Sequence, residues 1–193
     1  PEIKARRPRD WFKEFKWDAI RFANKTYAVF DACERANTQW VVWMDADTFV
    51  HSKWSFKDFM KFCPENAWLG YLARGQKWPE CGFYSLNTHK DICKDFLKEF
   101  ERVYEDADNG IFLMEEWHDS FVFEEVRKVI QKKNPHERFY NISGDLFNGE
   151  GHPIINSKLG AYIDHLKGDR KEIGKSNKPK DLVVKRTEDY WLT

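Results

Sequence analysis

The stretch Trp40-Val41-Val42-Trp43-Met44-Asp45-Ala46-Asp47 decides how this chain is interpreted. Its first five residues are apolar and rich in β-branched and aromatic side chains. Such a short continuous run predicts a strand that is buried on both faces of a largely parallel sheet. We expect this strand to carry the two aspartates to its carboxyl end, which is the edge where open α/β sheets bind their ligands.

The two aspartates are spaced so that they can act together. Residues i and i+2 of an extended chain point to the same side, so both carboxylates can face one ligand while Ala46 turns away. Two hard oxygen donors suit a divalent Mg²⁺ or Mn²⁺ ion, which takes further ligands from water and from substrate phosphates. Asp-x-Asp is also a common triplet in which one aspartate only caps the next turn. The preceding apolar strand favours the metal interpretation.

Helices and strands are expected to alternate along the rest of the chain. Residues 10–35 carry apolar side chains at helical spacing and predict one long amphipathic helix. Further helices are expected over residues 55–62, 88–104 and 119–132, and further strands over residues 67–72, 81–86 and 138–142. This order is typical of an α/β domain with a central sheet. We expect a single domain over residues 1–176 and a basic C-terminal tail over residues 177–193.

Composition disfavours several classes of protein. The chain of 193 residues balances 32 basic against 32 acidic side chains, which disfavours a nonspecific nucleic-acid binder. No apolar run approaches the roughly 18 residues of an integral membrane segment. The four cysteines form no Cys-x-x-Cys pair and are expected to be reduced and mostly buried, as in a cytoplasmic protein. Nine tryptophans fit either a large core or surfaces that stack on sugars and bases.

A second constellation lies far downstream, where His165, Gly168 and Lys171 form a His-x-x-Gly-x-x-Lys pattern. The histidine can offer a nitrogen to an ion, the glycine lets the backbone approach a phosphate, and the lysine supplies a compact cation. A diphosphate held between an ion and a lysine fits this pattern. Taken alone, a histidine in a basic loop usually has no such role, so the pattern gains its meaning from the two aspartates upstream.

The strand that ends in Asp-x-Asp, followed by the late His-x-x-Gly-x-x-Lys, resembles the GT-A glycosyltransferases. Among these it resembles the glycogenin-like retaining enzymes, which use nucleotide-diphosphate sugars, and small glycosyltransferase-like proteins of bacterial viruses. The resemblance covers residues from about 15 to 176 and implies a GT-A fold, a Rossmann-like mixed sheet flanked by helices. The family's late motif usually continues with Pro-Trp, whereas Glu172-Ile173 follows here.

The resemblance implies roles for the residues of both motifs. Asp45, Asp47 and His165 would be the ligands of a Mn²⁺ or Mg²⁺ ion. Gly168 and Lys171 would contact the donor diphosphate.

Two further segments gain a meaning from the same resemblance. Residues 80–85 resemble the strand that lines the sugar pocket, where Gly82 would leave room for the donor. Residues 115–120 resemble the acidic segment that faces donor and acceptor, where Trp117 would stack on a sugar. In an inverting enzyme Glu116 or Asp119 would be the general base, and in a retaining enzyme they would orient the acceptor or the donor. Asp119 can equally be only the N-cap of the helix that follows.

The N-terminal part of the chain departs from the family pattern. Arg21 and Lys25 lie one turn apart on the first helix and resemble cations that reach the donor phosphates, although a solvated helix face explains them as well. Enzymes of this fold have a βαβ stretch that binds the nucleotide base ahead of the Asp-x-Asp strand. Here 44 residues precede Asp45 and predict mainly one helix. Either the chain is N-terminally truncated or its base pocket is built differently.

These patterns predict a metal-dependent glycosyltransferase that moves a sugar from a nucleotide-diphosphate donor, expected to be a UDP-sugar, to a hydroxyl-type acceptor such as a glycan. The glycogenin likeness favours retaining transfer. The ion and Lys171 would neutralise the charge that develops on the departing diphosphate.

Two alternatives stay open. Asp45-Ala46-Asp47-Thr48 also fits the D-x-D-x-T of haloacid-dehalogenase-type phosphatases, in which Asp45 would be the nucleophile and Asp47 the acid/base. These enzymes need a later acidic pair, and the sequence holds no Asp-Asp, while Asp145 lacks a second aspartate at the usual spacing. The tryptophan content would also fit a carbohydrate-binding module without enzymatic activity.

Overall fold

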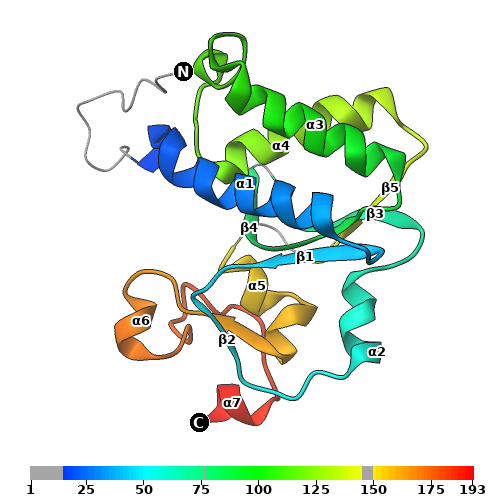
Figure 1. Ribbon diagram of the computed structural model, residues 1–193. Helices are drawn as coiled ribbons and strands as arrows, with labels where there is room; N and C mark the ends of the chain where they lie inside the picture. Colours follow the sequence, from blue (N-terminus) through cyan, green and yellow to red (C-terminus); the bar gives the residue numbers. More distant parts are fainter. Residues whose placement is uncertain (1–14, 76, 145–149) are drawn as a thin grey trace. The chain divides into compact units, whose positions relative to one another are not determined.

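The computed structural model describes residues 15–75, 77–144 and 150–193 (Figure 1). The chain forms two compact units, and each is built from two separate stretches of sequence. Unit 1 comprises the chain up to Val41 together with Asn87–Arg138, and unit 2 comprises Val42–Leu86 together with Phe139–Thr193. None of the boundaries between these stretches lies after residue 176, where the end of the domain was expected.

Unit 1 is helical. Its helices α1 (Ala19–Arg35), α3 (Asp91–Glu105) and α4 (Asp119–Lys133) contact one another. Each turns an apolar face inward, and the rings of Phe96, Phe100 and Phe123 meet between α3 and α4 at centroid distances of 5.1–6.1 Å. Two short 3₁₀ turns, Ala107–Asn109 and Ile111–Leu113, lie between α3 and α4.

The first helix starts later than the sequence pattern predicted. Asp18 is its N-cap, because the Asp18 carboxylate accepts a hydrogen bond from the Arg21 backbone N–H at 3.3 Å. A side chain that satisfies a free N–H group in this way fixes the start of a helix. The predicted residues 10–14 lie outside the described residues, and α1 itself ends at Arg35, as expected.

Unit 2 contains most of a four-stranded sheet with the order β1-β4-β3-β5. Its strands are β1 (Trp40–Met44), β3 (Ala67–Arg74), β4 (Lys77–Asn87) and β5 (Arg138–Asn141). A separate two-stranded sheet pairs β2 (Thr48–Val50) with β6 (Ile163–His165). The prediction of an α/β protein is therefore confirmed, while the GT-A architecture stays a prediction.

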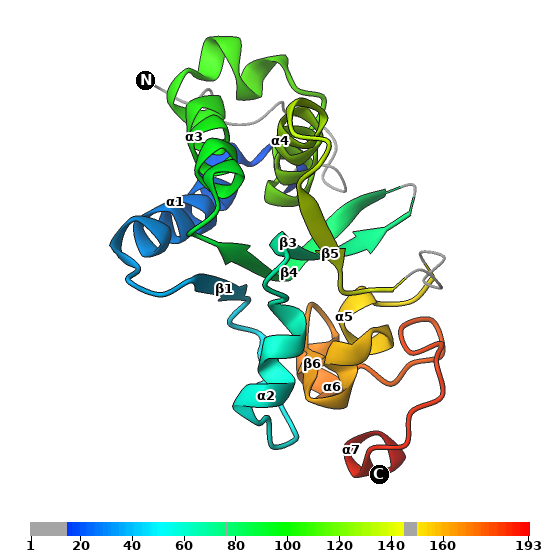
Figure 2. The ribbon, with the colours of Figure 1, turned by 90° about the vertical axis from the view of Figure 1, so that its right-hand side faces the viewer.

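Strand β4 runs antiparallel to both of its neighbours. Figure 2 shows β3 and β4 side by side, and their register pairs Leu69 with Leu86. On its other side β4 lies next to β1. The Asp45 N–H donates to the Gly82 carbonyl and the Thr88 N–H donates to the Gln39 carbonyl. Residue numbers thus rise along β1 as they fall along β4, which means that the two strands are antiparallel. The expectation of a largely parallel sheet is wrong for these strands.

The expectation that β1 is buried on both faces is also wrong. Its first four side chains are half-buried, and Met44 is 41% exposed. The reason is that β1 ends the order of the described strands, so that it is hydrogen-bonded to a neighbouring strand on one side only.

Unit 2 also contains several short helices. These are α2 (Phe56–Phe59), α5 (Pro153–Asn156), α6 (Arg170–Ile173) and α7 (Asp189–Leu192), with 3₁₀ turns at Met60–Phe62 and Lys158–Ala161. The helices α5 and α7 and both 3₁₀ turns contribute side chains to the core, whereas α2 and α6 have no buried residue. The buried side chains of the core are Phe62, Leu72, Phe83, Ile142, Ile154, Ile155, Leu159, Ile163 and Trp191.

The segment that was expected to be a basic tail contributes to this core. Trp191 is buried, and its Nε1 donates to the Gly160 carbonyl at 2.6 Å. The guanidinium of Arg186 donates to the carbonyl oxygen of Ile155. Residues 177–193 are thus an integral part of unit 2.

The cysteines and the helices match two features that composition predicted. All four cysteines have free, buried thiols, as predicted. Among the described residues, none of the helices has both the length and the apolar character needed to cross a membrane.

Candidate metal centre

Asp45 and Asp47 lie in a tight turn between β1 and β2. The Thr48 N–H donates to the Asp45 carbonyl at 3.0 Å, which closes a four-residue turn. The Trp43 Nε1–H donates to Asp45 Oδ1 at 2.6 Å and fixes that carboxylate. The extended backbone expected for this triplet is therefore wrong, and the turn, rather than strand alternation, brings the aspartates together.

Strand β6 brings His165 to the same turn. In the antiparallel register of β2 and β6, Thr48 lies opposite His165. The Leu166 N–H donates to the Asp47 carbonyl at 2.8 Å, which continues the pairing by one more bond. This pairing brings the backbone of His165 next to the end of the turn, where Nε2 of the imidazole meets the Asp47 carboxylate.

Strand β6 is itself fixed by a buried carboxylate. Asp164 is fully buried and accepts hydrogen bonds from the backbone N–H of His165 at 2.6 Å and of Ser176 at 2.9 Å. The Tyr190 hydroxyl donates to the same carboxylate at 2.9 Å. A buried carboxyl group that is satisfied by several donors holds its surroundings in one arrangement.

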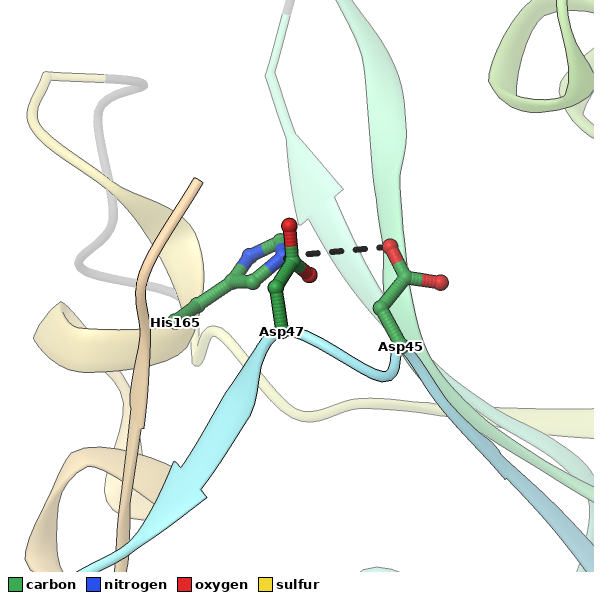
Figure 3. Close-up of side chains that lie close together, drawn as sticks. All are labelled: Asp45, Asp47 and His165. Carbon is green, nitrogen blue, oxygen red and sulfur yellow. Dashed lines mark hydrogen bonds and ion pairs between the residues drawn. The ribbon is translucent and has the colours of Figure 1, made fainter. Parts of the chain in front are cut away.

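The two aspartates and the histidine converge (Figure 3). Nε2 of His165 lies 2.9 Å from Oδ1 of Asp47 and 3.8 Å from Oδ2 of Asp45. One donor atom of each residue lies within 4.8 Å of the others, and no other group of this kind occurs in the described part of the chain. The imidazole is fully buried, whereas the carboxylates keep 22% and 23% of their side-chain surface exposed. The cluster is therefore open on its carboxylate side.

The imidazole of His165 is enclosed on its other sides. Its Nδ1 lies 3.1 Å from Nε2 of His152, a buried residue just ahead of α5. A Cβ atom on Gly82 would stand 2.8 Å from Cε1 of His165. The space at Gly82, which was expected to receive the donor sugar, is thus filled by the histidine ring.

Charges around the cluster shift two of its titrating groups. Burial alone would raise the pKa of the Asp47 carboxyl, but the imidazole of His165 and the ammonium of Lys171, 3.3 Å from Oδ2, outweigh it and lower that pKa. Burial lowers the pKa of His152 well below its usual value, and the neighbouring side chains of His165 and Arg170 lower it further. Asp47 is therefore an anion, and His152 a neutral imidazole, near neutral pH.

The remaining predicted residues of the late motif lie just beyond β6. Gly168 has a φ of +65°, in the left-handed region where glycine is favoured, and it is exposed. Lys171 lies in α6 with 59% of its side-chain surface exposed, and its ammonium pairs with Asp47. The structure therefore places Lys171 beside one of the three predicted ligands, Asp47.

Two predicted residues of unit 1 form an ion pair with each other. Lys25 Nζ lies 2.8 Å from Asp119 Oδ2, and both side chains are largely buried. The N-cap of α4 is His118, whose Nδ1 accepts from the Phe121 N–H, while Asp119 is the first residue of the helix. The alternative that Asp119 is an N-cap is therefore wrong.

The other predicted residues of unit 1 are also engaged there. Glu116 contacts the ammonium of Lys16 and lies 2.8 Å from Nε2 of His118. Trp117 is only 5% exposed, and its Nε1 donates to the Met114 carbonyl. The buried ring exposes little surface on which a sugar could stack, and the role of Trp117 stays a prediction.

Arg21 lies on the exposed side of α1. Its guanidinium carbon is 5.7 Å from the centre of the Phe22 ring. This placement fits the solvated helix face that was the alternative to a phosphate contact.

The donor set of the cluster fits a divalent cation. Carboxylates suit Mg²⁺ and Mn²⁺, and an imidazole favours a first-row transition ion, so Mn²⁺ is the better match of the two. Comparison of the chain with protein-family models, curated proteins and solved structures finds no match. Functional inference therefore rests on the chemistry of this cluster.

Proposed function

We propose that this protein is a metal-dependent glycosyltransferase, which moves a sugar from a nucleotide-diphosphate donor to a hydroxyl group. The observation that carries the proposal is the convergence of Asp45, Asp47 and His165, with the Lys171 ammonium paired to Asp47. The acidic turn and the late histidine come from segments 118 residues apart, so sequence proximity does not explain their contact.

The cluster suits the departure of a diphosphate. A Mn²⁺ or Mg²⁺ ion held by the two carboxylates and the imidazole would supply a Lewis acid for the leaving group. Lys171 ends in an exposed ammonium, which is free to rotate from Asp47 toward phosphate oxygens because its side chain is flexible. The left-handed backbone at Gly168 leaves open space, since a Cβ there would meet no atom within 4 Å. A phosphate can approach the backbone closely at such a position.

The donor and acceptor are assigned by chemical class. We expect a UDP-sugar as the donor and retaining transfer to a hydroxyl compound such as a glycan. The roles of Glu116 and Asp119 toward the acceptor stay predictions, because both carboxylates are paired with lysines in unit 1.

The test is a thermal-shift experiment with UDP, GDP, ADP and CDP, each with and without Mn²⁺, on the native protein and on Asp47→Asn. At a nucleotide concentration 100 times Kd, binding stabilises the folded state by about 2.7 kcal/mol. We expect a nucleotide to raise the melting temperature only when Mn²⁺ is present, and we expect Asp47→Asn to abolish this shift. Release of nucleotide diphosphate from the matching nucleotide sugar would then identify the donor.

Asp58→Asn is the matched control. Asp58 is a carboxylate of the same unit that pairs with Lys61 and lies outside the cluster, so its loss should leave the metal-dependent shift unchanged. Equal shifts in the native protein and Asp47→Asn would refute the proposal. Phosphate release from an aryl phosphate, with fluoroberyllate trapped at Asp45, would favour a phosphatase. Sugar affinity that survives chelation and ignores nucleotide would favour a carbohydrate-binding module.

A further inference from the structure

The imidazole of His165 makes one directed contact on its buried side, opposite the side that faces the aspartates. Its Nδ1 lies 3.1 Å from Nε2 of His152, and the two rings stand at 89° to each other with centroids 5.0 Å apart. Both rings are buried, at 0% and 6% exposure, so water does not compete for this contact. One hydrogen bond therefore joins the two imidazoles, and it carries one proton.

The position of that proton decides what His165 can do on its other side. A neutral imidazole has one N–H donor and one nitrogen lone pair. If Nδ1 of His165 carries the proton and donates to His152, its Nε2 presents a lone pair toward Asp45 and Asp47. If His152 donates instead, Nε2 of His165 carries the proton and donates to Asp47. Only the first arrangement can bind a cation through Nε2.

We propose that His152 is the positioning residue of the metal centre: it accepts the Nδ1 proton of His165 and so directs the Nε2 lone pair to the ion. This inference rests on the metal-binding part of the proposed function. Histidine ligands of metals generally donate their second N–H to a fixed acceptor, which sets both the tautomer and the ring orientation.

The backbone around His152 is fixed well enough for this role. Its N–H donates to the Asp181 carbonyl at 2.8 Å, and its carbonyl accepts from the side chain of Asn156 at 2.8 Å. Pro153 follows at the first position of α5 and restricts the backbone further. The backbone from which the His152 ring projects is thus held in place by contacts that do not involve the cation.

The far nitrogen of His152 permits both proton arrangements. Nδ1 of His152 is buried and has no hydrogen-bond partner among the described residues. A fixed donor or acceptor at that position would lock the tautomer of His152, and with it the tautomer of His165. Before an ion arrives, His152 can carry its proton on Nε2 and donate to His165, whose own Nε2 proton is donated to Asp47. When an ion binds, the Nε2 proton of His165 leaves to solvent, the shared proton moves to Nδ1 of His165, and His152 takes up a solvent proton on Nδ1, so that each ring stays neutral.

The first test is calorimetric titration with Mn²⁺ alone, on the native protein, His152→Ala, His152→Gln and Ser157→Ala. Loss of a residue that orients a metal ligand typically weakens metal affinity about 10- to 100-fold, and we expect this for His152→Ala. His152→Gln should recover a substantial part of the affinity, because its amide oxygen can accept the Nδ1 proton. Ser157 is buried at the end of α5 and donates to the Ile154 carbonyl, so its loss should lower stability but leave Mn²⁺ affinity unchanged.

The second test reads the tautomer directly. In ¹⁵N spectra of the imidazoles with diamagnetic Mg²⁺ bound, His165 of the native protein should carry its proton on Nδ1. This readout does not depend on whether His152→Ala folds.

The outcomes separate the two proposals. Native Mn²⁺ affinity in folded His152→Ala, or a proton on Nε2 of His165 in the loaded native protein, would overturn the role of His152 and leave the metal centre intact. A native protein that binds no Mn²⁺ would overturn the metal centre itself and the proposed function with it.

Discussion

Oδ1 of Asp47 lies 2.9 Å from Nε2 of His165, although 118 positions separate the two residues in the sequence. The short pairing of β2 with β6 creates this contact, because it sets Thr48 opposite His165. The same nitrogen is the one that lies nearest to Asp45, at 3.8 Å. A cation bound here must therefore replace a hydrogen bond, and its uptake is expected to compete with a proton for Nε2.

Gly82→Ala should weaken cation binding. The added methyl group would stand 2.8 Å from Cε1 of His165 and 3.1 Å from Ile154, so the ring has to move away from the aspartates. Overpacking of this kind costs about 1–3 kcal/mol of stability, and we expect Mn²⁺ affinity to fall at least tenfold in calorimetric titration. Ser85→Ala, a buried change in the same strand, is the control for stability alone. Unchanged affinity in folded Gly82→Ala would show that the ring position does not matter for the ion.

Lys171→Ala should separate metal binding from nucleotide binding. Lys171 neutralises Asp47 but supplies no lone pair to an ion, so Mn²⁺ affinity should be retained or rise. The affinity for the metal–nucleotide diphosphate complex should fall by about tenfold or more, because a charge-assisted hydrogen bond contributes about 1.5–3 kcal/mol. Lys158→Ala, an exposed lysine of the same unit, is the matched control. Equal nucleotide affinity in both variants would remove Lys171 from the proposed site.

Trp117→Ala should destabilise the protein without changing the metal centre. Removal of a buried tryptophan typically costs about 3–5 kcal/mol, and Trp117 packs against Phe112 at a centroid distance of 5.2 Å. Urea denaturation measures the loss, and Mn²⁺ titration should give the native affinity. A stable Trp117→Ala variant with impaired sugar binding would instead support the sugar-stacking prediction.

The ion pair of Asp181 with Arg170 should make stability depend on pH. The hydrogen bond from Arg170 lowers the pKa of Asp181 below its unfolded value of about 3.9. The ion pair therefore stabilises the folded protein fully at a pH above the unfolded pKa of Asp181, and this stabilisation is lost as the pH falls through the lower pKa of the folded state. Asp181 is 5% exposed, so Asp181→Asn should cost about 3 kcal/mol at pH 7.

Urea denaturation measures the free energy of unfolding of the native protein and of Asp181→Asn. We expect the difference between the two values to shrink as the pH falls below about 4, which is the unfolded pKa of an aspartate. If the difference in unfolding free energy stayed constant from about pH 7 to about pH 3, one unit below that pKa, the charge of the Asp181 carboxylate would not contribute to stability.

The helices were the most predictable part of the fold. Apolar spacing predicted helices over residues 88–104 and 119–132, and the structure has α3 at Asp91–Glu105 and α4 at Asp119–Lys133. Each of these helices buries one continuous face, and such a face produces apolar residues every three to four positions in the sequence. Strand direction was not predictable in this way, because an apolar run does not reveal whether its neighbour is parallel or antiparallel.

The candidate ligands were predictable, but the reason for their convergence was not. Strand alternation suggested that the aspartates share a side, whereas the structure uses a turn closed by Thr48. The strands β2 and β6 span three residues each, which is too short for a recognisable pattern. His152 gave no signal at all, because its role depends on a contact between the residue ahead of α5 and strand β6, both of which are distant from the acidic turn in sequence.

The most direct measurement of the central claim is an anomalous difference map from crystals soaked in Mn²⁺. We predict one strong peak at about 2 Å from a carboxylate oxygen of Asp45, a carboxylate oxygen of Asp47 and Nε2 of His165. A map that shows no peak among these three side chains, with the hydrogen bond between Asp47 and His165 still in place, would contradict the account.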